Sequence, residues 1–201
     1  MNPKDHWESV YSSKSDSEVS WTQSDPHLSL SLIREVCPPG SRVLDVGGGT
    51  SVLVDRLLEL NYRVSVLDIS PTAINRSRAR LGTAASKINW ITGDVTAIAS
   101  VGEHELWHDR AVFHFLTDAA DRGKYVGLLQ RSLLAGGHAI IATFAMDGPQ
   151  QCSGLEVCRY DGKSLASAIG RGFQLLRTEL EMHVTPWGKL QSFQYSLLRR
   201  I

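Results

Sequence analysis

The chain has 201 residues, and its 21 basic side chains balance 21 acidic ones. This length suits one domain with a substantial core. The neutral balance gives no broad field that would attract nucleic acid or an anionic membrane, and we find no run of about 18 apolar residues that could span a bilayer. The polar N-terminus lacks an apolar signal segment and the three cysteines cannot all pair. We therefore expect a cytoplasmic protein without membrane or nucleic-acid partners.

Short apolar runs alternate with helix-like segments from about residue 40 onward, which favours a parallel sheet with crossover helices. A helix over 27–36 is expected ahead of the sheet. Strands are expected over 42–46, 62–68, 87–94, 105–112 and 138–144. Helices are expected between them over 51–60, 70–81 and 121–133, and the last should stop at the glycine pair 136–137.

The C-terminal part changes character. Alternating runs over 173–184 and 190–200 flank the turn "TPWGK", which predicts an antiparallel hairpin. Five parallel strands finished by a hairpin differ from the plain dinucleotide-binding arrangement. No linker is visible, so we expect a single domain over 1–201. A less regular cap or lid would occupy 1–40, and a Rossmann-like, doubly wound α/β core 41–201.

Three glycines follow the first strand in "RVLDVGGGTS". Gly47 and Gly49 match the first two positions of a G-x-G-x-x-G fingerprint, but Val52 occupies the third. No lysine lies between Lys14 and Lys87, which argues against a phosphate-binding P-loop. Both observations make a bound pyrophosphate the weaker interpretation of this turn.

With its preceding acid, the turn resembles the first motif of class I S-adenosylmethionine-dependent methyltransferases. Asp45, Gly47, Gly49, Thr50 and Ser51 fit it, with Ser51 where a third glycine is often found. The resemblance implies a seven-stranded sheet and a bound S-adenosyl-L-methionine that becomes S-adenosyl-L-homocysteine. A carboxylate at the strand end suits a ligand that carries an ammonium and a sulfonium group.

Two later acids also end strands. Asp68, followed by Ile69, stands where an acid accepts hydrogen bonds from ribose hydroxyls. Asp94, with Val95 beside it, matches the methyltransferase position that contacts the adenine amino group. Each acid alone could be a helix N-cap, whereas the set points to the cofactor.

The resemblance places Asp109 and Arg110 against the methionine end of the cofactor, with Asp109 among the catalytic candidates. His114 would lie just beyond, as an acceptor-facing base or as a structural residue. Arg110 could alternatively steer a carboxylate. We expect His108 to be a satisfied strand residue that faces away from the cofactor.

Aromatic residues of the cap suit a sulfonium because a ring face attracts cations. Tyr11 is the catalytic candidate here and Trp21 the cofactor contact, while Trp7 is the weaker candidate; the alternative for all three is packing on the core. This cap is similar to the lids of the thiopurine, halide/thiol and tellurite methyltransferase-like groups. The "GGGTS" loop with such a lid also resembles lysine methyltransferases of elongation factor or citrate synthase.

A long polar loop after the fifth strand, residues 145–161, is expected to face the acceptor. Cys152 and Cys158 do not have zinc-site spacing, so no metal is predicted. They could bind a thiophilic arsenic or tellurium species, or be free thiols. His183, beside the hairpin turn, could reach the same edge or only decorate a strand.

The leading hypothesis is an enzyme that moves a methyl group from S-adenosylmethionine to a small-molecule nucleophile by in-line displacement. After the core is built, only the cap and one loop remain to bind an acceptor. The alternatives are protein lysine methylation and a cofactor-binding protein without turnover. The oligomeric state and the acceptor atom, sulfur, oxygen or nitrogen, are not readable from the sequence.

Overall fold

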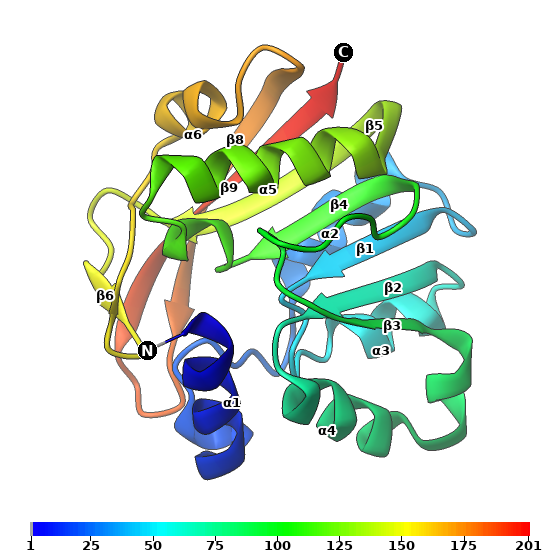
Figure 1. Cartoon of the computed structure of the whole chain (residues 1–201), viewed down its shortest axis with the longest axis vertical. Helices are drawn as coiled ribbons and strands as arrows, with labels where there is room; N and C mark the ends of the chain where they lie inside the picture. Colours follow the sequence, from blue (N-terminus) through cyan, green and yellow to red (C-terminus); the bar gives the residue numbers. More distant parts are fainter. Residues whose placement is uncertain (1) are drawn as a thin grey trace.

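The computed structural model describes residues 2–201. Its centre is a seven-stranded sheet in the order β3-β2-β1-β4-β5-β9-β8 (Figure 1). Strands β1 to β5 run parallel to one another, and β8 and β9 form an antiparallel hairpin that pairs with β5 through β9. The predicted α/β fold with a C-terminal hairpin is therefore confirmed. The strands are β1 (Arg42–Val46), β2 (Arg63–Asp68), β3 (Asn89–Thr92), β4 (His104–Arg110), β5 (Leu133–Phe144), β8 (Phe173–Val184) and β9 (Leu190–Arg200).

Helices cover both faces of this sheet. Helices α2 (His27–Val36) and α3 (Leu53–Glu59) pack on one face, where Val43 of β1 points, and α5 (Ala119–Ser132) and α6 (Gly162–Ile169) pack on the other, where Leu44 points. Because both faces are covered, the central strands are buried along nearly their whole length. The remaining elements are α1 (Pro3–Ser13), η1 (Asp16–Glu18), α4 (Pro71–Leu81), η2 (Gly82–Lys87), η3 (Phe113–Phe115), β6 (Gln151–Cys152) and β7 (Leu155–Glu156).

Local chemistry explains where α4 begins. The Ser70 hydroxyl accepts a hydrogen bond from the Ala73 amide at 3.1 Å, and Pro71 occupies the first turn, as the sequence predicts. This cap places the helix directly after β2, so that the amino end of α4 faces the carboxyl edge of the sheet. That edge is where ligands bind in open α/β sheets.

The glycine pair after α5 has a different role from the predicted one. The helix ends at Ser132, and β5 already begins at Leu133, so Gly136 and Gly137 lie inside the strand. Gly136 has a φ of 77°, and a Cβ on Gly137 would lie 2.8 Å from the Glu105 carbonyl oxygen. The glycines therefore permit close approach of β4 and β5 where their register shifts, rather than ending the helix.

The cap is more regular than expected, because residues 3–13 form helix α1. The Asn2 side chain accepts from the Lys4 amide at 3.0 Å, and Pro3 stands in the first turn. Helix α1 lies over the carboxyl edge of the sheet, beside α4 (Figure 1). Over residues 2–201, no helix combines the length and the apolar character needed to cross a bilayer.

Candidate active site

A cavity of about 420 Å³ opens at the carboxyl edge of β1, β2 and β4, underneath α1. Such a volume lies within the range typical of small-molecule sites. Its walls come from the strand ends, the lid, η3, the start of α5 and the β6–β7 segment. The sequence-predicted residues among them are Tyr11, Trp21, Gly47, Asp68, Ile69, Asp94, Val95 and Arg110. The lining does not include Asp45, Gly49, Thr50, Ser51, Asp109 or His114, which were also predicted for the site.

The glycine loop is shaped by its own backbone. Gly47 and Gly49 have φ values of 66° and 49°, a region that side-chain-bearing residues rarely adopt. A Cβ on Gly49 would lie 2.6 Å from the hydroxyl of Tyr11, so only glycine lets the lid approach this closely. Gly47 lines the cavity, whereas Gly49 supports the lid above the loop.

Thr50 and Ser51 act on the loop rather than on the cavity. Arg80 of α4 donates hydrogen bonds to both of their carbonyl oxygens at 2.8 Å, and Ser77 donates to the Gly49 carbonyl at 2.8 Å. The Ser51 hydroxyl accepts from the Leu53 amide at 3.1 Å, at the start of α3. The small residues that complete the motif thus hold the loop in shape.

Asp68 and Asp94 present carboxylates to the cavity. Asp68 is 5% exposed and accepts from the Ser70 amide at 2.8 Å. Burial raises the pKa of Asp68 to about 7, against the hydrogen bonds that favour its charged form. One oxygen of Asp94 accepts from the amide and the hydroxyl of Thr96, both at 2.7 Å. These acids retain further acceptor capacity for a ligand that donates hydrogen bonds.

Asp45 lies behind the loop instead of on the cavity wall. Its Oδ1 is 2.7 Å from Nδ1 of His108, and the other ring nitrogen is 2.9 Å from the Ser29 hydroxyl. Both side chains of the pair are about 3% exposed. Asp45 is thus bonded to His108 of β4, which in turn bonds Ser29 of α2, and its contact with a ligand's amino-acid end stays a prediction. His108 is a satisfied strand residue in this arrangement.

Asp109 and His114 are buried in the protein interior and do not line the cavity. Asp109 accepts from the Val112 amide at 2.8 Å and from the Tyr125 hydroxyl at 2.6 Å, and burial raises its pKa to about 6. It therefore caps the turn into η3. His114 is fully buried and accepts from the Phe144 amide at 3.3 Å.

Burial, with a smaller effect of the nearby Arg110, lowers the pKa of His114 to about 3. Its Nε2 has no hydrogen-bond partner within residues 2–201. The ring lies edge-on to Phe115 and tilted against Phe144, with distances of 4.5 and 4.8 Å between the ring centroids. An imidazole enclosed by rings and away from the cavity fits the structural alternative better than the role of base.

Arg110 lines the cavity but is already engaged. Its Nε donates to the Tyr195 hydroxyl at 3.0 Å, and Nη1 donates to the Trp21 carbonyl at 3.0 Å. The third contact is an ion pair with Glu181 at 3.5 Å. The guanidinium also lies 4.2 Å from the centroid of the Phe193 ring. These contacts leave little of its donor capacity for a substrate carboxylate.

Aromatic rings form the lid side of the cavity. Trp7 lies edge-on to Trp21 at 5.6 Å and to Phe115 at 4.9 Å, and Tyr11 lies at 6.1 Å from Trp21. Burial and the neighbouring Asp68 raise the pKa of Tyr11 far above its ordinary value, so its hydroxyl stays protonated. The predicted Trp-x-x-x-Tyr pair therefore meets the second tryptophan at one site.

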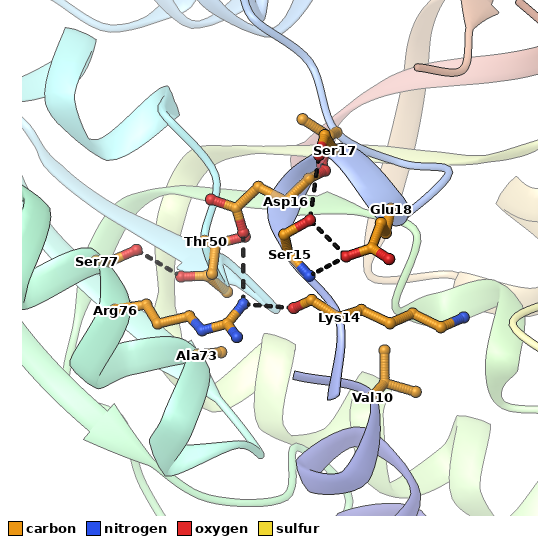
Figure 2. A network of polar contacts seen from close by, with 12 residues as sticks. Val10, Lys14, Ser15, Asp16, Ser17, Glu18, Thr50, Ala73, Arg76 and Ser77 are labelled. Atoms are coloured by element: carbon orange, nitrogen blue, oxygen red, sulfur yellow. Dashed lines mark hydrogen bonds and ion pairs between the residues drawn. The ribbon is translucent and has the colours of Figure 1, made fainter. Parts of the chain in front are cut away.

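Polar contacts fasten this lid to α4. The Glu8 carboxylate accepts from the Ser70 hydroxyl at 2.6 Å and from the hydroxyl of Thr72. Figure 2 shows the other end of the attachment, where Arg76 donates to the Lys14 carbonyl at 2.7 Å and reaches Asp16 at 3.8 Å. The lid is thus held over the cavity by specific contacts in the middle of α1 and just beyond its C-terminal end.

Several cavity residues were missed by sequence reasoning. His6, Phe115, Leu155 and Glu156 line the cavity, as does Cys152, which was considered only for its thiol. His6 belongs to α1 and its Nε2 has no partner within the described residues. The sequence could have indicated this position, because a helix that begins at Pro3 places His6 on the lid next to Trp7.

The remaining candidates lie elsewhere. Cys158 is on a second, more open hollow. Nε2 of His183 is 2.6 Å from the Ser20 carbonyl, behind Trp21. Between residues 2 and 201, no group of three or more His, Cys, Asp or Glu side chains has a metal-binding arrangement.

Comparison with known proteins finds relatives of part of the core. Residues 43–137 match the family model described as "Methyltransferase domain". Nodulation protein S of Rhizobium tropici is 30% identical over 117 residues, which are 58% of this chain and 49% of that protein. The chain therefore spans about half the length of the curated relatives it matches.

Solved structures share the whole fold at lower identity. One, described as "Conversion of a Disulfide Bond into a Thioacetal Group during Echinomycin Biosynthesis", has a TM-score of 0.80 and 19% identity, covering 98% of this chain and 92% of that one. The N-methyltransferase NodS of Bradyrhizobium japonicum WM9, in complex with S-adenosyl-L-homocysteine, has a TM-score of 0.68 and 15% identity, covering 89% of each chain. The resemblance to class I methyltransferases that the glycine motif predicts is confirmed.

Proposed function

We propose that this chain, with its methyltransferase domain and class I fold, binds S-adenosyl-L-methionine and transfers its methyl group to a small-molecule nucleophile. The observation that carries the proposal is the pair of carboxylates, Asp68 and Asp94, on the wall of one cavity with the Gly47 loop. Aromatic lid residues close the same cavity. Together, the two acidic side chains, the glycine-loop backbone and the aromatic rings of the lid suit a nucleoside that carries a cationic sulfur.

The residues present fit this cofactor. Asp68 would accept hydrogen bonds from the ribose hydroxyls, and Asp94 from the adenine amino group, beside Val95. The acidic residues that line the cavity, which also include Asp121 and Glu156, would repel a diphosphate, which argues against a dinucleotide. The single arginine on the wall, Arg110, is paired with Glu181 and does not reverse this balance. The ring faces of Trp7 and Trp21 can favour a positive charge.

The chemistry divides between the ligand and the chain. When bound, S-adenosylmethionine supplies a methyl group that its sulfonium already activates. The chain binds and orients the reactants and excludes water. The docked helix α1 carries out the last task, since Tyr11 and Trp7 lie over the cavity. Tyr11, whose hydroxyl stays protonated, can donate a hydrogen bond but does not serve as a base near neutral pH.

An acceptor would occupy the part of the cavity that the nucleoside leaves free. We assign to this part Phe115 and Leu155 as apolar walls and His6 and Glu156 as polar groups, all of which line the cavity. The cavity is closed on the lid side and small, which supports a compact acceptor over a protein side chain. Nitrogen is a reasonable acceptor atom, because the structural neighbour NodS is an N-methyltransferase.

The test has two steps. Calorimetry should first show that S-adenosyl-L-homocysteine binds the purified protein. The protein is then incubated with methyl-labelled S-adenosylmethionine and a cell lysate, and label is expected in the small-molecule fraction. Label in a discrete protein band would favour lysine methylation instead. Binding without label in either fraction would support a cofactor-binding protein, and absence of binding would overturn the proposal altogether.

A further inference from the structure

Behind the cavity wall, the carboxylate of Glu181 collects three donors from distant parts of the chain. Gln23 Nε2 donates at 3.1 and 3.2 Å, the Tyr195 hydroxyl at 3.2 Å, and the Arg110 guanidinium lies at 3.5 Å. The Glu181 side chain is 17% exposed and that of Arg110 is 10% exposed. We call Gln23, Arg110, Glu181 and Tyr195 the Glu181 clamp.

The clamp holds a segment that has no regular structure of its own. Residues 20–26 join η1 to α2 without helix or strand. Arg110 binds the Trp21 carbonyl, Glu181 binds the Gln23 side chain, and Nε2 of His183 is 2.6 Å from the Ser20 carbonyl. All three anchors belong to the sheet, on β4 and β8. The position of this segment is therefore set by side chains of the sheet.

Trp21 connects the clamp to the cavity. Its side chain lines the cavity and packs edge-on against Trp7 and Tyr11 of the lid. A shift of its backbone would move the ring and loosen the lid packing. Removing Glu181 would also leave the Arg110 charge buried and uncompensated, which is unfavourable. Arg110 would then be drawn away from the Trp21 carbonyl.

We propose that Glu181 is a positioning residue, which holds Trp21 in the cavity wall through Arg110 and Gln23 and so maintains cofactor affinity. This inference rests on the proposed function, because it takes the cavity to be the cofactor site. Glu181 itself is not part of the cavity lining. It belongs to the C-terminal hairpin, outside the matched methyltransferase domain of residues 43–137.

The test compares Glu181→Ala with Glu181→Gln and with the control Glu179→Ala. Glu179 lies on the same strand but pairs with Arg177 at 2.9 Å, outside the clamp. Hydrogen exchange of the ligand-free proteins should be about tenfold faster over residues 20–25 in Glu181→Ala, because charge-assisted hydrogen bonds are lost. S-adenosyl-L-homocysteine should bind about tenfold more weakly to this variant by calorimetry.

Glu181→Gln keeps an acceptor oxygen for Gln23 and Arg110 but not the charge that balances Arg110, so it should restore part of the protection and affinity. Glu179→Ala should behave as the wild type does in both measurements. Unchanged exchange over residues 20–25 in Glu181→Ala would overturn the inference. So would an equal loss of protection throughout β8 and β9, which would mean general damage to the hairpin. If the wild type does not bind S-adenosyl-L-homocysteine, the proposed function fails. The hydrogen-exchange measurement still tests whether Glu181 holds residues 20–25 in place.

Discussion

Asp68 combines burial with contact to the cavity, and this makes it the most informative single residue of the site. It is 5% exposed and receives the Ser70 amide, yet it lines the cavity. Replacing it by alanine should remove charge-assisted hydrogen bonds of about 1.5–3 kcal/mol, or about ten- to a hundredfold in affinity for S-adenosyl-L-homocysteine. Calorimetry measures this, with the exposed Glu59→Ala as control. Unchanged affinity would contradict the placement of the ribose.

His114 shows how burial changes the meaning of a histidine. Because its ring is fully buried beside Phe115 and Phe144, His114→Ala should leave a cavity and lower the free energy of unfolding by about 2–5 kcal/mol. Urea unfolding measures the loss, and the affinity for S-adenosyl-L-homocysteine should stay close to that of the wild type. A large loss of turnover at unchanged stability would instead revive the role of base.

At the scale of elements, the docking of α1 on α4 decides whether the cavity is closed. Burial favours the neutral form of Glu8, but hydrogen bonds from Ser70 and Thr72 outweigh it and hold the Glu8 pKa below its ordinary 4.5. A lowered pKa means that this contact stabilises docking above that pH and is lost as the pH falls through the lowered value. The lid should therefore loosen in acid.

The substitution Glu8→Ala should loosen the docking of the lid on α4 at neutral pH. Amide exchange over 3–13 is expected to rise in this variant, because α1 loses its attachment to the amino end of α4. Asp5→Asn is the matched control, since Asp5 is an exposed acid on the same helix. Equal exchange in Glu8→Ala and the control would show that the aromatic packing of Trp7 and Tyr11 alone keeps the lid closed.

At the scale of the whole molecule, buried acids set a pH dependence of stability. The pKa of Asp68 is raised from 3.8 to about 7, so the folded state binds more protons than the unfolded state between these values. Its contribution is present at low pH and is lost as the pH rises toward 7. Asp109, raised to about 6, acts in the same direction, whereas His114, whose pKa is lowered from 6.5 to about 3, acts oppositely as the pH falls between those two values.

Comparison with a variant isolates the effect of Asp68. The wild type should gain stability relative to Asp68→Asn as the pH falls from about 8 to about 5, because only the wild type takes up the proton. Urea unfolding of both proteins across this range measures the difference. A constant difference would show that the carboxyl group titrates alike in the folded and unfolded states.

Much of the molecule was predictable because short-range patterns specify it. The helix over 27–36 and both hairpin strands were predicted with their observed bounds. Asp68 and Asp94 line one cavity, because acids at the carboxyl ends of parallel strands converge on one edge of the sheet, and their contacts with the cofactor stay a prediction. Helix α1 was not predicted, although Asn2 as the N-cap and Pro3 in the first turn mark its start.

The sequence by itself determined the order of strands and helices, the glycine loop and the acids around it, since periodicity, capping and turn chemistry act over a few residues. Only the tertiary structure decided which of these acids faces the cavity. Asp45 and Asp68 both lie at the carboxyl ends of strands, but behind the loop Asp45 is bonded to His108, which also bonds Ser29. Strand register and packing between distant segments set that choice, as they set the pairing of Glu181 with Gln23 and Arg110. Contacts of this kind join residues far apart in the chain, and no local pattern encodes them.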